Sequence, residues 1–467
     1  MSILGKAPAY FQYMPRILRS TVFTAAAARN YQLRYGREYR TFREFLTTSN
    51  DMALDEREDW QLDRLKSLVS DAIANTRYYA HRQEDYRPAL GASSLDDALA
   101  ALPVLTKAAL RKQPDAFLNA LHKTVTVSST SGTTGSPMTI QHDRKSLMRR
   151  FAFLHDHAER NGIPPFSRSI RLSGRLITRT TDPQPYLYNA FERQYFMSTY
   201  HLHERYARAV SDLVHRAQPV FIDGYPSAIA QFVELAASVR PLPASLTHAI
   251  STAETLDPGT VERITGAAGI TLLDYYSASE GLPFIQQCRH GVYHVRWESG
   301  IFEVEREGKY CRNGDGNLVC SSFVQNRTPL IRYATGDWVE DLRAPHQCRC
   351  GLWTQTVKGV LGRVEDLVVT RDGRALGMFS YRTLKTIAGL GETQIIQRDT
   401  DKFTVLSTGA SPDDHASIRQ QIEAQFAQAL GYPVQVDLQG VDEIPRGPNG
   451  KLRLVVSRLQ TPPGAVA

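Results

Sequence analysis

The sequence has no apolar run approaching the roughly 20 residues that a membrane-spanning helix needs. Its first twenty residues also lack a continuous apolar segment followed by a cleavage site, which is the pattern of a secretion signal. Cysteine is scarce, with five in 467 residues. An odd number of cysteines in a chain without a secretion signal argues against a disulfide framework. We therefore expect an untargeted, cytoplasmic protein without a membrane span, whose cysteines are better tested as metal ligands.

Charge of one sign is not concentrated in any part of the chain. Lysine and arginine number 55 against 48 aspartates and glutamates, which gives a net charge of +7. The densest basic stretch, residues 14–43, is typical of a solvated helical face, and basic residues with interleaved aromatics do not cluster as in a nucleic-acid surface. We therefore expect no nucleic-acid partner. A hydrophobic content of 42% with 22% charged residues is typical of a globular enzyme, and the length predicts more than one domain.

Serine, threonine and glycine are concentrated in residues 127–137, "VSSTSGTTGSP". Apolar and polar residues alternate before this segment, in "KTVTV", and after it, in "PMTIQHD", so it is predicted to join two strands. No Lys-Ser/Thr pair follows its last glycine, which excludes an ordinary P-loop nucleotide site. Two interpretations stay open on this evidence: a flexible linker, or a cradle whose backbone N–H groups and hydroxyls bind phosphate oxygens.

A strand, helix, strand, helix, strand pattern covers residues 219–277. The strands are "PVFIDG", "THAIST" and "TLLDYYS", and the helices between them are "PSAIAQFVELAASV" and "DPGTVERITGAAG". Such alternation predicts a parallel sheet with helices on its faces and ligand groups at the carboxyl ends of the strands. Those ends are polar and aromatic, in residues 224–227, 252–254 and 276–280.

The remaining segments complete an α/β fold with two domains. Apolar residues at helical spacing predict a helix over residues 56–79, within a mainly helical first hundred residues. Residues 413–430 form a second predicted amphipathic helix, with Ile418, Ile422 and Phe426 on its apolar stripe and Gly431 as its stop. The strand "VQVDLQ" follows it. We therefore predict a large α/β domain with parallel sheets and flanking helices over residues 1–362, and a small mobile α+β domain over residues 363–467.

Five short motifs occur in an order that resembles a known superfamily. "SSTSGTTGSP", "YSASE", "YATGD", "GRVED" and "RGPNGK" resemble the successive motifs of the adenylate-forming superfamily of acyl-CoA synthetases, peptide-synthetase adenylation domains and luciferases. The upstream "LPVLTKAALRK", the lack of a lysine closing the first motif and "CRC" before the fourth are similar to the phenylacetate-CoA ligase branch. "VVTRDGRAL" is similar to its capsule-biosynthesis subgroup.

This resemblance implies that a carboxylate attacks the α-phosphorus of ATP, forming an acyl-adenylate and pyrophosphate. It assigns the β- and γ-phosphates to the first motif: Ser128, Ser129, Thr130, Ser131, Gly132, Thr133, Thr134 and Gly135. It places adenine against Tyr276, beside Ala253 and Glu254, with Ser277 standing where a glycine is usual. Ser279 would touch the α-phosphate and Glu280 would hold Mg²⁺, a cation that favours oxygen ligands.

The same resemblance assigns the ribose hydroxyls to Asp337, with Arg363 nearby. Lys451 would bring a positive charge between the carboxylate and the α-phosphate, as a residue of the small domain. A second half-reaction would follow rotation of that domain about a hinge at Glu365 or Asp366. Taken alone, "GPNGK" is more typical of an exposed loop.

The four residues Cys288, His294, Cys348 and Cys350 form a C-x5-H and C-x-C set. Thiolate and imidazole ligands suit tetrahedral Zn²⁺, and some members of the phenylacetate-CoA ligase branch carry a structural zinc on a similar arrangement. His290 is an alternative ligand, and free thiols are the alternative to a metal site.

The sequence therefore predicts an ATP- and Mg²⁺-dependent ligase for a carboxylic acid. Tyr225 and Phe284, near the strand ends, suggest an aromatic or otherwise hydrophobic acid. Coenzyme A is the favoured acceptor, an amine or a carrier-protein arm being the alternative, and the enzyme is expected as a monomer or homodimer. A basic zinc-containing nucleic-acid-binding or assembly protein, and a degenerate ligase scaffold, are the competing interpretations.

Overall fold

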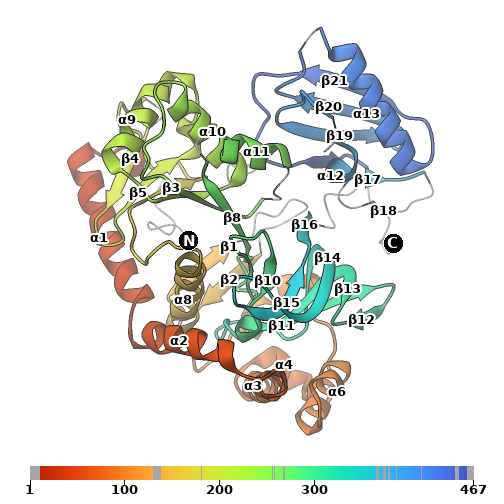
Figure 1. The fold of residues 1–467 in the computed structure, drawn as a ribbon. Helices are drawn as coiled ribbons and strands as arrows, with labels where there is room; N and C mark the ends of the chain where they lie inside the picture. The colour runs from red at the N-terminus through yellow and green to blue at the C-terminus, as the bar shows by residue number, and fades with distance from the viewer. Residues whose placement is uncertain are drawn as a thin grey trace.

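Two bodies of unequal size make up the chain in the computed structural model, a large domain and a small C-terminal one (Figure 1). The structure describes residues 11–129, 138–179, 181–254, 256, 258–266, 269–363, 368–371, 375–376, 379–384, 387–411, 413–446 and 452–459. No helix among these residues has the length and apolarity to cross a membrane.

A mixed sheet of fourteen strands runs through the large domain. Its path is β12 (Lys309–Cys311), β11 (Gly300–Arg306), β13 (Gly314–Ser322), β14 (Tyr333–Gln347), β15 (Trp353–Val357), β10 (Tyr293–Val295), β9 (Ile285–Gln287), β8 (Thr271–Tyr276), β7 (His248–Thr252), β6 (Phe221–Gly224), β3 (Ser169–Ser173), β5 (Gln194–Ser198) and β4 (Tyr186–Asn189). β16 (Gly359–Arg363) pairs with β14. The strands from β5 to β8 are parallel to one another, which confirms the predicted parallel arrangement, and the described pairings on either side of this group are antiparallel.

Side chains of the parallel strands alternate between two helical layers. Ile170, Leu172 and Ile222 pack against α9 (Ala207–Ala217) and α10 (Pro226–Ala237). α11 (Pro258–Gly266) lies on the same face, as the sequence predicts. The opposite face is covered by α8 (Arg144–Arg160), which begins where the β1 (Thr126–Ser129) and β2 (Thr139–His142) hairpin ends. That hairpin confirms the two strands predicted around the serine- and glycine-rich segment.

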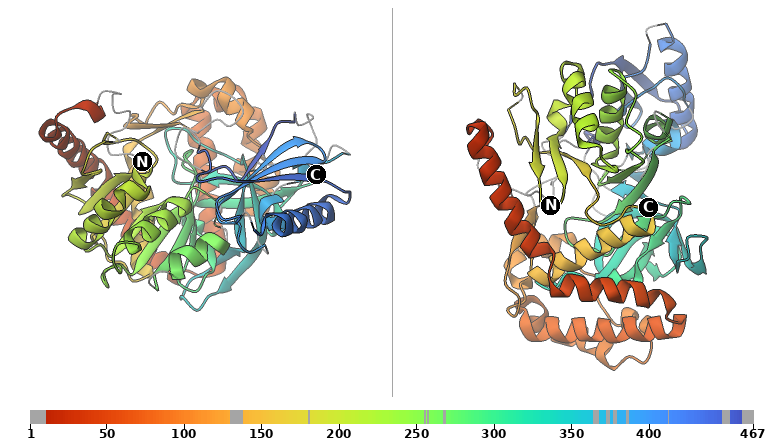
Figure 2. Two further views of the ribbon diagram at one scale, coloured as in Figure 1. Left: turned by 90° about the horizontal axis from the view of Figure 1, so that it is seen from above. Right: turned by 60° about the vertical axis from the view of Figure 1, so that its left-hand side comes forward.

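The N-terminal helices run along one side of the large domain, from α1 beside β4 to the helices beneath β11 and β13 (Figure 2). They are α1 (Arg16–Arg34), α2 (Arg37–Thr48), α3 (Leu54–Asn75), α4 (Arg77–His81), α5 (Gln83–Tyr86), α6 (Leu95–Ala100) and α7 (Lys107–Lys112). The predicted helix over 56–79 is observed as α3, whose Leu62, Leu65 and Val69 pack in one core with residues of β11, β13 and β14. Thr76 ends α3 and caps α4, because its hydroxyl accepts the N–H of Tyr79.

The small domain is built on a second sheet in the order β21-β20-β19-β22. Its strands are β19 (Thr393–Asp399), β20 (Lys402–Ser407), β21 (Gln435–Gly440) and β22 (Val455–Ser457), beside a short ribbon of β17 (Val368–Val369) and β18 (Ala375–Leu376). α12 (Phe379–Leu384) and α13 (His415–Leu430) contribute to its core. Ile418, Ile422 and Phe426 are buried and Gly431 takes a left-handed conformation, as predicted for α13. The 362/363 boundary stays a prediction, since residues 364–367 are not described.

Candidate active site

The carboxyl ends of β6, β7 and β8 lie side by side, because these strands are parallel and adjacent. They present Tyr225, the Ala253–Glu254 pair and Tyr276 to one cleft. Ala253 has a φ of 71°. A left-handed conformation is uncommon for a residue with a Cβ and is found most often at functional turns. The residues predicted to surround the adenine therefore share one edge of the sheet, as parallel strands require.

Tyr276 and Asp337 meet across this edge. The Tyr276 hydroxyl donates a hydrogen bond of 2.6 Å to the Asp337 carboxylate, and burial together with this carboxylate raises the pKa of Tyr276 well above 10. Asp337 lies on β14, where its backbone pairs with that of Arg363 on β16. Gly336, with a φ of 70°, lies within β14 at the point where the register against β13 shifts. Two of the sequence motifs are thus joined by one short bond between residues that are 61 positions apart.

Ser279 and Glu280 follow β8 in a turn that is tied to the predicted phosphate segment. The Ser128 hydroxyl donates to the carbonyl of Ser279 at 2.7 Å. Glu280 is 5% exposed, and the Tyr333 hydroxyl lies 3.5 Å from its Oε1. A buried carboxylate beside Ser279 is well suited to hold a hard cation such as Mg²⁺.

His142 is a site residue that the sequence analysis missed. Its Nε2 lies 2.7 Å from Ser128 Oγ, and its Nδ1 lies 2.8 Å from Gln325 Nε2. Burial lowers the pKa of His142 to about 3, so the ring is neutral. The Gln325 amide then donates to Nδ1, the Nε2–H donates to Ser128, and Ser128 donates onward to Ser279. No motif flagged this histidine, because it only becomes informative once Ser128 and Ser279 are known to be in contact.

The small domain reaches the same cleft through Glu254. The N–H of Leu452 donates to Glu254 Oε1 at 3.0 Å, and the Ser227 hydroxyl donates to Oε2 at 2.8 Å. Burial raises the pKa of Glu254. Arg446 donates to Ser227 Oγ at 2.6 Å and to the Glu392 carboxylate at 2.8 and 3.0 Å. The chain next to the predicted catalytic lysine therefore lies at the adenine-side strand end.

Several predicted site residues lie outside the described part of the chain. They are Thr130, Ser131, Gly132, Thr133, Thr134, Gly135, Glu365, Asp366 and Lys451, together with the side chains of Ser129 and Arg363. Their assignments stay predictions.

The structure separates the two residues predicted to line the acid pocket. Tyr225 is half-buried next to Glu254, and burial raises its pKa to about 12. Phe284 is instead fully buried and stacks on Phe153 at a centroid distance of 5.0 Å, so it is a core residue. The aromatic composition of its segment suggested a pocket, but the side chain points into the packing between α8 and β8–β9.

A cavity of about 80 Å³ lies instead between α8 and the parallel strands. Aromatic rings contribute to its lining, among them Phe151, Phe166 and Tyr275. Its other lining groups are polar: His155, Arg171, Glu192, Gln194 and Asp223. Arg171 is paired with Asp223, with Nε at 2.7 Å from the carboxylate, and Glu192 is paired with Arg34 at 2.8 Å.

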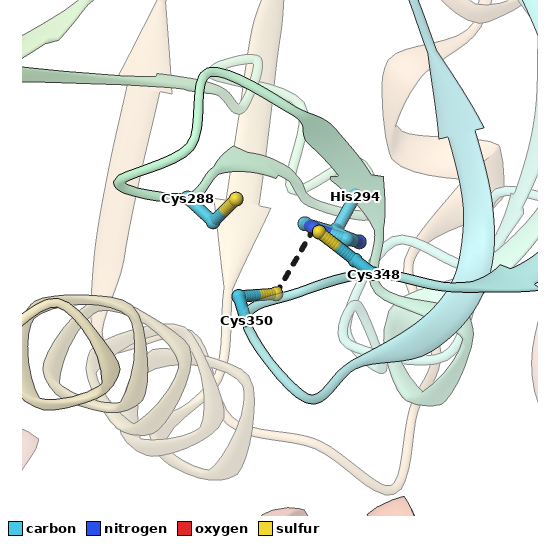
Figure 3. A group of neighbouring side chains, drawn as sticks. All are labelled: Cys288, His294, Cys348 and Cys350. Atoms are coloured by element: carbon cyan, nitrogen blue, oxygen red, sulfur yellow. Dashed lines mark hydrogen bonds between the residues drawn. The ribbon is translucent and has the colours of Figure 1, made fainter.

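A second cluster confirms that the cysteine and histidine set is brought together (Figure 3). The ligand atoms of Cys288, His294, Cys348 and Cys350 all lie within 4.8 Å of one another. His294 Nδ1 lies 2.9 Å from the Thr354 hydroxyl, while its Nε2 lies 3.3 Å from Cys350 Sγ. Hydrogen bonds from Cys350 and His294 lower the pKa of Cys288. His290, the alternative ligand, is not in this group.

Two tight turns build that cluster. Cys288 and Gly291 close one turn between β9 and β10, and Cys348 and Gly351 close an equivalent one between β14 and β15. Both glycines have positive φ values, 77° and 90°. Three thiols and one imidazole make up a donor set that is found in structural zinc sites. The hydrogen bond between His294 Nδ1 and the Thr354 hydroxyl fixes the orientation of the imidazole, as is usual for a zinc ligand.

Comparisons with known proteins agree with this geometry. Residues 369–458 match the model of the CapK C-terminal domain. Protein CapK of Staphylococcus aureus is 24% identical over 375 residues, covering 77% of this chain and 80% of the relative. 2-Hydroxyisobutyryl-CoA ligase, solved in the postadenylation state with R3-HIB-AMP, superposes with a TM-score of 0.66 at 20% identity, covering 88% of this chain and 91% of that one.

The chain has the fold of the adenylate-forming ligases, with a CapK-type C-terminal domain. Anthranilate-CoA ligase AuaEII, in complex with anthranoyl-AMP, is a further structural neighbour, with a TM-score of 0.50 at 17% identity over 72% of this chain and 66% of that one. The fold expected from the five motifs is therefore confirmed, and the similarity to CapK agrees with the subgroup that "VVTRDGRAL" resembles. These neighbours are CoA ligases that form acyl-adenylates.

Proposed function

We propose that this adenylate-forming ligase fold activates a carboxylic acid as its acyl-adenylate, with release of pyrophosphate from ATP. The observation that carries the proposal is the meeting of Glu254, the Tyr276–Asp337 pair, the Ser279–Glu280 turn and the Leu452 N–H at one edge of the sheet. Groups from both domains converge there, which is the arrangement needed to position two reactants and to stabilise charge on phosphate oxygens.

Each residue has a role that follows from its place. Tyr276 forms a flat wall for the adenine and holds Asp337, whose remaining acceptor capacity can bind the ribose hydroxyls. Ser279 lies exposed at the turn, where its hydroxyl can donate to the α-phosphate. Glu280 would hold Mg²⁺, which when bound shields the triphosphate charge. Lys451, one residue before the anchored Leu452, would supply a positive charge between the acid and the α-phosphate.

The cavity between α8 and the sheet is the proposed acid pocket. It lies on the sheet face opposite to α9 and α10, and Tyr275 of β8 reaches it. The acid is expected to enter along this face and to meet the nucleotide at the end of β8.

The second half-reaction is proposed as transfer of the acyl group to coenzyme A, after rotation of the residue 363–467 domain about Glu365 or Asp366. Either a thiolate or an amine can attack an acyl-adenylate, so the acceptor has to be identified by experiment. Cys288, His294, Cys348 and Cys350 are proposed to bind a structural Zn²⁺ that pins the β9–β10 hairpin to the β14–β15 turn.

The test uses the full chain with Mg-ATP and a panel of carboxylic acids. Pyrophosphate release is measured alone, with coenzyme A and with hydroxylamine. Acid-dependent release of pyrophosphate and AMP is the expected result, with faster turnover in coenzyme A. Release of ADP and phosphate, or release that is independent of acid, would refute the proposal.

A further inference from the structure

Arg150, in the middle of α8, has no carboxylate partner within 4.0 Å among the described residues. One N–H of its guanidinium donates to the Ser277 hydroxyl, at the long distance of 3.4 Å. The side chain is half-buried, and none of its nitrogen atoms is both sealed from solvent and without a partner. Arginine carries five N–H donors in a fixed fork. Most of this fork therefore has no hydrogen-bond partner among the described residues.

Arg149, the residue before Arg150 on α8, has a structural role. Arg149 Nε donates to Glu38 at 2.7 Å, and its NH1 donates to the Phe323 carbonyl at 3.2 Å. Arg149 thus links α8 to α2 and to the segment that follows β13, whereas Arg150 makes no comparable bond to a carboxylate or a backbone carbonyl. Burial lowers the pKa of Arg150, so an anionic partner would stabilise its charged form.

The contacts of Arg150 at the end of β8 place it near the proposed acid pocket. Tyr276 points toward Asp337, the proposed ribose ligand, while Tyr275 lines the cavity under α8. Ser277 directly follows the last residue of β8, and Tyr275 and Glu280, on either side of it in the chain, both act on Arg150 electrostatically. Arg150 reaches Ser277 from α8, so its guanidinium lies between the cavity and the turn of Ser279 and Glu280.

The other charges on this side are already balanced. Arg171 is paired with Asp223, and Glu192 with Arg34. Among the described carboxylates, Glu280 is the one that acts on Arg150 electrostatically, and it is proposed to hold Mg²⁺. Of the described cations that line the cavity or reach Ser277, Arg150 is therefore the one without a salt-bridge partner.

We propose that the acid activated by this protein carries a second anionic group, a carboxylate or a phosphate, which the guanidinium fork of Arg150 binds. This inference rests on the proposed function and narrows it, since it replaces the expected hydrophobic acid by a doubly anionic one. A planar fork binds carboxylate or phosphate oxygens in pairs, which gives both energy and orientation. Arg150 is a specificity-determining residue in this scheme, and the reacting carboxylate is left to face Ser279.

The test compares acids in matched pairs that differ only in the second charge. Glutarate is set against glutaramate, isophthalate against 3-carbamoylbenzoate, and 3-phosphoglycerate against glycerate, so that the carboxylate and phosphate arms are separate. Pyrophosphate release with Mg-ATP is measured for the unmodified protein, Arg150→Gln and Arg150→Lys. Arg144→Gln is the matched control, since Arg144 is exposed on the same helix and donates to the Gln32 carbonyl.

The anionic member of at least one pair should be favoured in kcat/KM by about 10- to 100-fold, as expected for hydrogen bonds to a charged group. Arg150→Gln should remove that preference without changing the KM for ATP, Arg150→Lys should restore part of it, and Arg144→Gln should leave it intact. Equal use of neutral and anionic acids, or an equal loss for both in Arg150→Gln, would overturn the inference. Failure with every anionic acid would also overturn it, and calorimetry of Mg-ATP binding then shows whether the proposed function falls as well.

Discussion

Replacing Arg446 by alanine removes a link that holds the small domain against the large one. Arg446 belongs to the "RGPNGK" motif and donates to Ser227 at the start of α10, across the domain boundary. Its second nitrogen binds Glu392, which also lies 3.7 Å from Arg263 of α11. The same Ser227 donates to Glu254, the acceptor of the Leu452 N–H. Loss of Arg446 therefore loosens the contact that keeps the segment next to Lys451 at the cleft.

The size of the effect follows from burial. The side chains of Arg446 and Glu392 are only 14% and 11% exposed, so their bonds are not the weak kind found between exposed ions. A hydrogen bond to a charged group contributes about 1.5–3 kcal/mol. A loss of about 2–3 kcal/mol lowers the equilibrium constant for this pose by roughly 30- to 150-fold, since 1.36 kcal/mol is a factor of ten. We expect acyl-adenylate formation to slow by up to that factor.

The assay separates the two half-reactions. Formation of the adenylate is followed as pyrophosphate release in single turnover, and its consumption is followed with preformed acyl-adenylate and coenzyme A. Arg446→Ala should slow the first and leave the second within about twofold, because only the first needs the lysine at the cleft. Arg419→Ala is the control, as Arg419 forms an exposed ion pair with Glu423 on α13 of the same domain. Unchanged adenylation, or an equal loss in both half-reactions, would refute this reasoning.

Three further predictions concern single groups. Lys451→Ala should slow adenylation by about two to three orders of magnitude, the cost of losing a charge contact in the transition state, whereas Lys402→Ala at an exposed site of the same domain should not. Purified protein should contain one zinc per chain by elemental analysis. Cys288→Ser should lose this zinc, while Cys311→Ser, which changes an exposed thiol, should keep it. Equal zinc contents in the two variants would show that the cluster is not the zinc site. Burial raises the pKa of Asp274 to about 6, so ionisation of this side chain destabilises the folded state. This destabilisation is absent below about pH 4 and grows as the pH rises to about 6. Asp274→Asn should therefore gain up to about 3 kcal/mol relative to the unmodified protein between pH 4 and pH 7, measured by denaturant unfolding, and a pH-independent difference would contradict the shift.

The parallel core was predictable because its signals are local. The three apolar strands, their proline-initiated helices and the hairpin around residues 127–137 follow from periodicity over a few residues. Once the strands are parallel, their ends must be neighbours, which is why Glu254 and Tyr276 were correctly placed at one cleft.

Other features depend on contacts between distant segments. The role of His142 and Ser128 is visible only from the hydrogen bond between Ser128 and the Ser279 carbonyl, which joins residues 151 positions apart. Phe284 was assigned to a pocket because its composition fits one, and the stacking on Phe153 that buries it has no sequence signature. The sequence likewise does not show that Arg150 lacks a carboxylate partner, because it directly follows Arg149, which has a structural role. Periodicity predicts which face a residue lies on, but not what it meets there.

Acid-dependent exchange of labelled pyrophosphate into ATP, measured without any acceptor, tests the central claim most directly. An acyl-adenylate that forms reversibly at the end of β8 predicts label in ATP only when acid and Mg²⁺ are both present. Bound ATP that never exchanges label with any acid of the panel, including the doubly anionic ones, would contradict it.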